Sequence, residues 1–302
     1  EYLEGRGLTP AVCDAFGIGW APDGGSPLLA SATAAGVEPG QLQRVGLVKA
    51  RDDGSHYDFF YNRIVIPIRD DKGRTVGFGA RALPRTRGKG PKYVNTPETE
   101  LFHKGRLIYG YDLALASLRK EKRLVLVEGY TDVMGAHQAG YRGVCAVLCT
   151  ATTTEHAALV RRTGVRRVTL VFDGDDAGAR ATRRALEGLL PLGVEIDVAA
   201  PPDGQDPCDL CVRDGGAPFG ELLDAPVPWV DFLVGRIAGA EDLDERGLSE
   251  AVDELLEVVR VVRAPLHRAA LLKSIAGGLG FDAADVRAQF EALEARRPRR
   301  AA

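Results

Sequence analysis

Hydrophobic and polar positions follow a regular order only from about residue 122 onward. There, short apolar runs alternate with stretches of helical spacing; the runs lie at 124–127, 144–148, 168–172 and 194–198, and the helical stretches at 132–139, 154–162 and 177–190. The first three runs are almost continuously apolar, which is typical of strands covered on both faces. This alternation predicts a mostly parallel sheet with right-handed crossovers.

The flanking segments have different patterns. Before the sheet, Thr9-Pro10 opens a short helix that Gly17 closes, and runs at 63–68 and 75–79 predict two strands joined by a turn at 70–73. Beyond the segment 224–228 no strand pattern recurs, and helical spacing appears at 230–237, 248–262, 265–276 and 283–296. We therefore expect a mixed α+β and α/β fold with a mixed N-terminal subdomain (1-120), a central α/β subdomain with a parallel sheet (121-212) and a helical C-terminal subdomain (213-302).

Composition narrows the class of protein. The chain has 302 residues, of which 45% are hydrophobic and 27% charged, as in ordinary globular proteins. No apolar run approaches the ~20 residues of a membrane helix, and the start is unlike a signal peptide, so we expect no membrane partner. A start without Met suggests a piece of a longer protein. Five cysteines argue against a disulfide scaffold and favour a reducing cytoplasm.

Charge is unevenly distributed. Residues 60–110 carry eleven Lys/Arg against four Asp/Glu, a balance of +7, whereas residues 196–260 carry four against sixteen, a balance of −12. The basic stretch suits phosphates, and the acidic stretch is either solvated surface or a metal-binding region.

Acidic residues follow three of the predicted strands, at the edge where open parallel sheets bind ligands. They are Glu128 and Asp132 after the first strand, Asp173 and Asp175 after the third, and Asp206 and Asp209 after the fourth. Carboxylates without His or Cys among them favour a hard cation such as Mg²⁺ or Mn²⁺. The alternative for the third strand is a plain Asp-Gly turn in which Asp176 caps the helix that begins at Ala177. Three acidic strand ends together favour the metal.

Other chemistries have weaker signals. The chain has no phosphate-binding G-x-x-x-x-G-K-[ST] loop and no H-E-x-x-H motif, and Gly77-Phe78-Gly79 does not continue as a dinucleotide fingerprint. Cys208 and Cys211, together with Cys145 and Cys149, could form a four-thiolate zinc site. The position of Cys145 within a strand argues instead for a buried core cysteine, so no zinc is expected.

The basic stretch contains residues suited to a nucleic-acid strand. Basic side chains alternate there with aromatic and amide side chains: Arg63, Arg69, Arg81, Lys92 and Lys104 with Phe78, Tyr93, Asn95 and Phe102. Arg and Lys contact phosphates, Tyr can stack on a base, and Asn can bind a base edge or a ribose. The alternative is a solvated strand face with Tyr93 and Phe102 in the core.

These motifs resemble a known family. The phrase EGYTDV at 128–133 and the DGD at 173–175 are similar to the Toprim domain of bacterial primases, topoisomerases and some nucleases. The longer phrases are more specific and resemble the DnaG-type primase polymerase domain: NRIVIPIRD at 62–70, GFGAR at 77–81, PKYVNTPET at 91–99 and LFHKG at 101–105. The resemblance runs over essentially the whole chain.

The resemblance implies primer synthesis, a metal-dependent nucleotidyl transfer of ribonucleoside triphosphates on single-stranded DNA. It implies that Glu128 is the catalytic carboxylate, supported by Asp132, and that Glu128, Asp173, Asp175 and Asp206 hold Mg²⁺ or Mn²⁺. It assigns template and nucleotide binding to Arg63, Arg81, Lys92, Tyr93, Asn95 and Lys104. It also implies a monomer at the bacterial replication fork in the cytoplasm, and contacts with the replicative helicase and single-strand-binding protein through flanking regions.

Two positions depart from the family pattern, and two other functions remain open. Cys149 replaces a Gly, and Cys208 replaces the second Asp of an Asp-Pro-Asp phrase, so we expect Asp206 to carry the metal contact and Asp209 to cap the helix beside Cys208. The alternatives are Toprim-type strand breakage, for which Tyr93 or Tyr61 would have to be the nucleophile, and a non-catalytic nucleic-acid-binding module.

Overall fold

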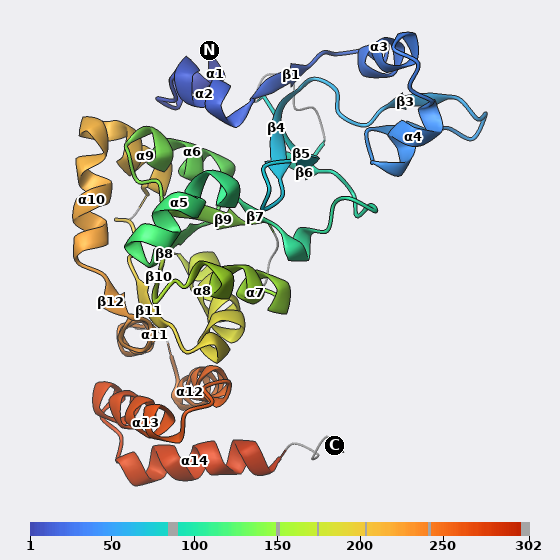
Figure 1. Cartoon of the computed structure of the whole chain (residues 1–302). Coiled ribbons are helices and arrows are strands. Elements are labelled where there is room, and N and C mark those ends of the chain that lie inside the picture. Colours follow the sequence, from blue (N-terminus) through green and yellow to red (C-terminus); the bar gives the residue numbers. More distant parts are fainter. Residues whose placement is uncertain (84–89, 149–151, 174, 203, 241–242, 297–302) are drawn as a thin grey trace. The chain divides into compact units, whose positions relative to one another are not determined.

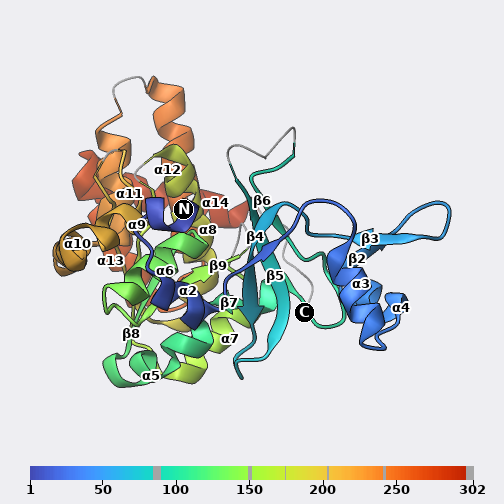
Figure 2. The same cartoon turned by 90° about the horizontal axis from the view of Figure 1, so that it is seen from above.

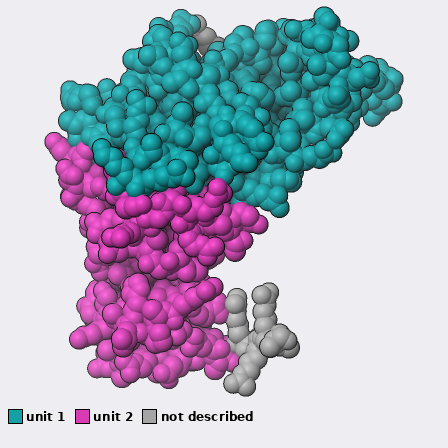
Figure 3. Space-filling view, in the orientation of Figure 1, with its two compact units in different colours: residues 1–120, 127–149, 206–219 teal, residues 121–126, 150–205, 220–302 magenta. Residues whose placement is uncertain are grey.

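The computed structural model describes residues 1–83, 90–148, 152–173, 175–202, 204–240 and 243–296. Its contacts divide the chain into two compact units (Figure 3), unit 1 with residues 1–120, 127–149 and 206–219 and unit 2 with residues 121–126, 150–205 and 220–302. The chain therefore passes between the units several times. Its first crossing coincides with the predicted boundary at 120, and the three-part division (1-120, 121-212, 213-302) stays a prediction.

Unit 1 contains an antiparallel four-stranded sheet in the order β1-β4-β5-β6 (Figure 1). Its strands are β1 Gly19–Ala21, β4 Arg63–Arg69, β5 Thr75–Ala82 and β6 Tyr93–Asn95. Ile64, Ile66 and Ile68 are buried whereas the residues between them are half-buried, because successive side chains of a strand point to opposite faces. The predicted pair of strands is confirmed as β4 and β5.

The remaining elements of unit 1 are mostly helices. These are α1 Tyr2–Gly5, α2 Pro10–Phe16, α3 Pro27–Ala34, α4 Pro39–Arg44, η1 Lys104–Arg106, α5 Tyr111–Glu121, α6 Tyr130–Gln138, α9 Pro207–Val212, η3 Arg213–Gly216 and the start of α10 Ala217–Asp224. Two further strand pairs are antiparallel, β2 Val48–Ala50 with β3 His56–Asp58 and β7 Ile108–Tyr109 with β9 Val144–Val147. The predicted first helix is confirmed, since the Thr9 hydroxyl caps α2 and Gly17 ends it in the left-handed region.

Unit 2 contains the strands β8 Arg123–Val127, β10 Arg167–Leu170, β11 Glu195–Val198 and β12 Val227–Pro228. β10 pairs in parallel with both β8 and β11, which confirms the predicted parallel strands, and β12 pairs antiparallel with β11. β12 lies within the segment 224–228, and beyond that segment the described residues form helices, as predicted. This two-residue strand contains Pro228 at a sheet edge, where a missing N–H is tolerated, and it is too short to produce a periodic pattern.

The helices of unit 2 are α7 Thr154–Thr163, α8 Asp176–Leu189, η2 Leu190–Leu192, α11 Trp229–Ala238, α12 Glu245–Arg260, α13 Pro265–Leu279 and α14 Ala283–Ala295. The last four pack on one another (Figures 1 and 2) and confirm the predicted helical segment. Val252, Leu255, Leu256 and Val259 form the buried stripe of α12, at the spacing of an amphipathic helix. Within the described ranges, no helix is both long and apolar enough to cross a membrane.

Candidate nucleotidyl-transfer site

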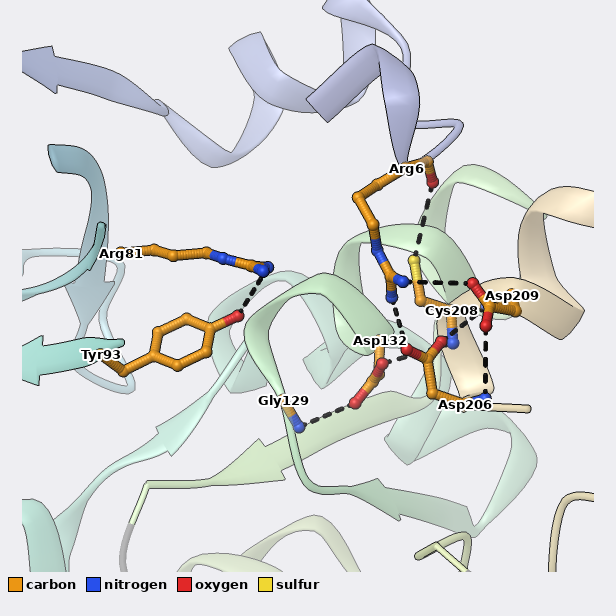
Figure 4. A network of polar contacts seen from close by, with 8 residues as sticks. All are labelled: Arg6, Arg81, Tyr93, Gly129, Asp132, Asp206, Cys208 and Asp209. Atoms are coloured by element: carbon orange, nitrogen blue, oxygen red, sulfur yellow. Dashed lines mark hydrogen bonds and ion pairs between the residues drawn. The ribbon is translucent and has the colours of Figure 1, made fainter. Parts of the chain in front are cut away.

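The first acidic motif lies at the start of α6 in unit 1. Glu128 is exposed and directly follows the last residue of β8. Asp132, which is only 7% exposed, accepts hydrogen bonds from two backbone N–H groups, that of Gly129 at 2.9 Å on Oδ2 and that of Cys208 at 3.3 Å on Oδ1. The Asp132 carboxylate thus joins the N-termini of α6 and α9 (Figure 4). Each oxygen of the Asp132 carboxylate therefore holds one backbone N–H group in place, that of Gly129 or that of Cys208.

The third acidic motif forms the start of α9. The Asp206 carboxylate is the N-cap and accepts the Asp209 N–H at 2.8 Å, so the expectation that Asp209 is the capping residue is wrong. Asp209 takes part in the cap as the third helical residue, whose side chain accepts the Asp206 N–H at 3.5 Å in a capping box. Arg6 donates to Asp206 Oδ2 at 2.5 Å, and its other terminal nitrogen lies 3.3 Å from Asp209 Oδ1 (Figure 4). Burial disfavours the charge of Arg6, but the hydrogen bond and charge of Asp206 outweigh it and raise the pKa of Arg6. Arg6 was not predicted as a site residue, because no spacing in the sequence connects positions 6 and 206.

The cysteines of α9 are core residues. Cys208 is 0% exposed, and burial raises its pKa to about 12, which keeps the thiol protonated at neutral pH. Burial also raises the pKa of Cys211 and of Cys145. Metal ligation needs thiolates, so this environment favours packing. Cys149 lies outside the described residues, and the described part of the chain contains no group of three His, Cys, Asp or Glu side chains placed to hold a metal ion.

The second acidic motif lies in unit 2, at the start of α8. Asp175 is the N-cap, and its Oδ1 accepts the Gly178 N–H at 2.8 Å. The alternative in which Asp176 caps the helix is therefore wrong by one residue; Asp176 is the first helical residue and pairs with Arg236 at 2.7 Å. A side chain at Gly178 would collide with the Asp173 backbone, so glycine at this position allows the first turn of α8 to lie directly against Asp173. Gly174 lies outside the described residues.

A cluster of aromatic and basic side chains lies on the β5–β6 face of unit 1. Arg81 and Tyr93 are opposite each other in the register, and Arg81 donates to the Tyr93 hydroxyl at 3.0 Å. The Arg81 guanidinium lies 4.2 Å from the ring centre of Tyr2 and 5.2 Å from that of Tyr93, within cation–π range of both. Lys92 lies 5.8 Å from the Tyr93 ring. The positive charges of Arg81 and Lys92 therefore lie close to aromatic rings.

Tyr130 connects this cluster to α6. Its hydroxyl donates to Asn95 Oδ1 at 2.8 Å, and its ring lies 6.1 Å from that of Tyr93. Gly79, which shares the strand face with Asn95, makes room for it, since a Cβ there would lie 2.5 Å from the Tyr130 hydroxyl. A glycine inside a strand often marks such a close approach. The glycines of the Gly77-Phe78-Gly79 phrase could therefore have indicated that another side chain packs against this strand. The motif that carries Glu128 and Asp132 is thus anchored to the basic strands.

Gly79→Ala is expected to lower the free energy of unfolding by about 1–3 kcal/mol, because the added methyl group overpacks the Tyr130 ring. Gly19→Ala in β1 is the matched control, since nothing lies within 4 Å of its new Cβ. Urea unfolding of both variants measures the effect. Equal stability of the two variants would contradict this account of Gly79.

The other predicted binding residues have local partners. Arg63 donates to the Pro91 carbonyl at 3.0 Å, and Lys104 begins η1 with its N–H bonded to Glu98 Oε1 at 3.1 Å. Tyr93 is 37% exposed, and partial burial raises its phenol pKa. A protonated phenol that accepts a bond from Arg81 is not activated as a nucleophile, which disfavours Tyr93 in a strand-breaking reaction. The sequence between β5 and β6 contains the basic Gly/Pro-rich segment 84–91, of which residues 84–89 lie outside the described residues.

The candidate metal ligands of each unit are carboxylates, the donors that Mg²⁺ and Mn²⁺ prefer. Glu128 and Asp206 belong to unit 1, and Asp173 and Asp175 belong to unit 2. Asp206 already stabilises one positive charge, that of Arg6. Cys208 is buried, and burial raises the pKa of its thiol, which disfavours the thiolate form that a metal would need.

Comparisons with known proteins agree with this chemistry. Residues 1–115 match a family model described as the DNA primase catalytic core, N-terminal domain, and residues 122–200 match the Toprim domain. A DNA primase of Deinococcus radiodurans is 42% identical over 235 residues, which are 78% of this chain and 41% of that protein. The chain spans less than half the length of the first curated relatives it matches.

Solved structures are similar over most of the chain. The RNA polymerase domain of Mycobacterium tuberculosis primase DnaG has 35% identity and a TM-score of 0.80, and the alignment covers 91% of this chain and 89% of that domain. A DnaG primase catalytic domain bound to single-stranded DNA has 34% identity and a TM-score of 0.77, and the alignment covers 94% of this chain and 89% of that domain.

Proposed function

This chain belongs to the family of DnaG-type DNA primases, and on that premise we propose that it synthesises RNA primers on single-stranded DNA by metal-dependent nucleotidyl transfer. The observation that carries the proposal is the pairing, within unit 1, of a carboxylate-rich helix start at α6 with a basic and aromatic strand face, joined by the Tyr130–Asn95 hydrogen bond. A similar catalytic domain bound to single-stranded DNA supports it. Binding alone gains nothing from carboxylates beside a polyanion.

We propose that Glu128, Asp173, Asp175 and Asp206 hold Mg²⁺ or Mn²⁺. When bound, such ions increase the nucleophilicity of an attacking 3′-hydroxyl, neutralise the charge of the leaving pyrophosphate and favour in-line displacement. The N-cap bonds of Asp175 and Asp206 fix the orientation of each carboxylate. Asp132 acts as a positioning residue, because its two oxygens hold the backbone of Gly129, next to Glu128, and of Cys208.

We propose that the template and the nucleotide contact Arg63, Arg81, Lys92, Tyr93, Asn95 and Lys104. The exposed part of the Tyr93 ring offers a stacking surface. Arg81 orients that ring by donating a hydrogen bond to its hydroxyl, and the guanidinium of Arg81 is itself positioned over the ring of Tyr2. Asn95 accepts from Tyr130 and retains its amide N–H groups as donors. Backbone-directed contacts of this kind predict binding that depends on salt and tolerates sequence changes.

Lys92→Gln is expected to weaken single-strand binding and to reduce the slope of log affinity against log salt by about 0.7, the contribution of one phosphate contact on a single strand. Lys72→Gln, which removes the same charge from the exposed β4–β5 turn, is the control. Fluorescence anisotropy at several salt concentrations gives both slopes. An unchanged slope for Lys92→Gln would remove Lys92 from the proposed binding surface.

The function is tested by incubating the chain with Mg²⁺ or Mn²⁺, single-stranded DNA and labelled ribonucleoside triphosphates, with EDTA as the control. Metal-dependent labelled oligoribonucleotides are expected. Cleavage of the DNA without synthesis would indicate the Toprim strand-breaking alternative, and binding without either reaction would indicate a non-catalytic module. The helicase and single-strand-binding partners, a monomeric state and the location at the replication fork are further proposals that rest on the family resemblance.

A further inference from the structure

A cavity of about 550 Å³ lies in unit 2, between α7, the C-terminal half of α8 and the segment that follows α12. Its polar wall includes Thr152, Arg161, Glu187 and Arg263, and its apolar wall includes Ala158 and Leu192. None of the residues assigned above to catalysis, metal ions or template lines it. A volume of this size is typical of small-molecule sites.

The two arginines bring unneutralised positive charge to this cavity. The guanidinium groups of Arg161 and Arg263 make no ion pair or hydrogen bond with any described residue, whereas Arg167 and Arg236 of the same unit pair with acids. A guanidinium presents planar donors that match phosphate oxygens in a bidentate geometry. Two of them at one cavity therefore suit a doubly charged phosphoryl group.

Thr152 adds a donor that lacks a partner. Its hydroxyl oxygen is buried and makes no hydrogen bond within the described part of the chain. Thr152 lies directly against α8 because position 188 is glycine; a Cβ there would be 2.7 Å from Thr152 Cβ and 2.5 Å from its carbonyl oxygen. Glycine inside a helix costs about 1 kcal/mol relative to alanine, and a buried hydroxyl without a partner is also unfavourable. A ligand oxygen at this wall would satisfy that hydroxyl.

The remaining walls distinguish a nucleotide from a bare anion. Glu187 contributes one negative charge, makes no ion pair with a described residue, and would repel free phosphate while accepting hydrogen bonds from sugar hydroxyls. Ala158 and Leu192 offer an apolar surface for a flat ring. We propose that this cavity binds a nucleoside monophosphate, with the phosphoryl group at Arg161, Arg263 and Thr152, the sugar at Glu187 and the base against the apolar wall.

Adenosine 5′-monophosphate is the probe, titrated into the chain by calorimetry in EDTA, which keeps divalent ions from the proposed catalytic carboxylates. One site is expected, and Arg161→Gln or Arg263→Gln should each weaken binding at least about tenfold. Arg162→Gln, the adjacent residue of α7 outside the cavity wall, is the matched control and should stay within about twofold. Both cavity variants should retain primer synthesis, so loss of this site is distinguishable from failure of the proposed function.

Thr152→Val supplies a second readout. The variant removes the hydroxyl without a partner, so it should raise Tm while weakening binding of the monophosphate at least about threefold; a merely structural Thr152 would not combine these two effects. Inorganic phosphate should bind at least about tenfold more weakly than adenosine monophosphate. Equal affinity for phosphate and the monophosphate, no saturable binding, or binding that neither arginine variant weakens would overturn the proposal.

Discussion

Asp175→Asn is expected to reduce primer synthesis at least about 100-fold while leaving the fold intact. Asn caps helices as well as Asp does, so the bond from the Gly178 N–H is kept and α8 retains its start. What is lost is the negative charge that a divalent ion needs from this side chain. Thermal melting and incorporation of labelled ribonucleotides, measured on the same preparation, separate the two effects.

Asp176→Asn is the matched control, because it removes one charge one residue further along the same helix. Asp176 is exposed and pairs with Arg236, an ion pair worth about 0–1 kcal/mol at a surface. Its synthesis should stay within about threefold of the unmodified chain. If Asp175→Asn retained near-normal synthesis, or if both variants lost it equally, the assignment of the DGD motif to the metal ions would be wrong.

Asp206→Asn is expected to have a similarly large effect, again at least about 100-fold on Mg²⁺-dependent synthesis. The amide keeps the cap to the Asp209 N–H but loses the charge shared with Arg6. The ion pair is half-buried, so a loss of about 1 kcal/mol in the free energy of unfolding should accompany the loss of activity. The activity loss is too large to follow from that change in stability.

Two neighbouring variants make this prediction specific. Asp209→Asn removes the charge of the second acidic partner of Arg6, at 3.3 Å. It should reduce Mg²⁺-dependent primer synthesis by less than about fivefold. Cys208→Ala removes a buried, protonated thiol and should be nearly silent in synthesis. An effect of Cys208→Ala as large as that of Asp206→Asn, or stoichiometric zinc that both substitutions release, would contradict the assignment.

Local sequence patterns were sufficient for the parallel strands of unit 2. Apolar runs locate β8, β10 and β11 to within one or two residues. The predicted run at 168–172 outlasts β10, which ends at Leu170, because Val171 and Phe172 remain buried beyond the strand. Burial produces the apolar pattern, and strand pairing ends earlier than burial does.

Helix starts within acidic runs were harder to predict. Asp175 and Asp176 are adjacent, and Asp206 and Asp209 are three residues apart, so either member of each pair could supply the cap. The backbone conformation decides, since the capping residue is extended and its neighbour is helical. The candidate ligands Asp175 and Asp206 are therefore also caps, a double role that sequence alone does not separate.

The long-range contacts of the candidate site could not be derived from spacing. Arg6 and Asp206 are 200 positions apart, and Tyr130 and Asn95 are 35 apart. Such pairs depend on packing of whole elements, here α1, α6 and α9 with the β5–β6 strands. The residue types predicted for the basic face were informative, but the roles of Tyr2 and Arg6 became visible only in the fold.

The most direct test of the central claim is extension of a short oligoribonucleotide annealed to a single-stranded DNA template, because it requires synthesis but no initiation. With Mg²⁺ and single labelled ribonucleoside triphosphates, we expect only the nucleotide complementary to the next template base to be added. Addition should stop in EDTA and in the Asp175→Asn variant. No extension by the folded chain, or extension that ignores the template base, would contradict the account of this chain as a template-directed primer-synthesising domain.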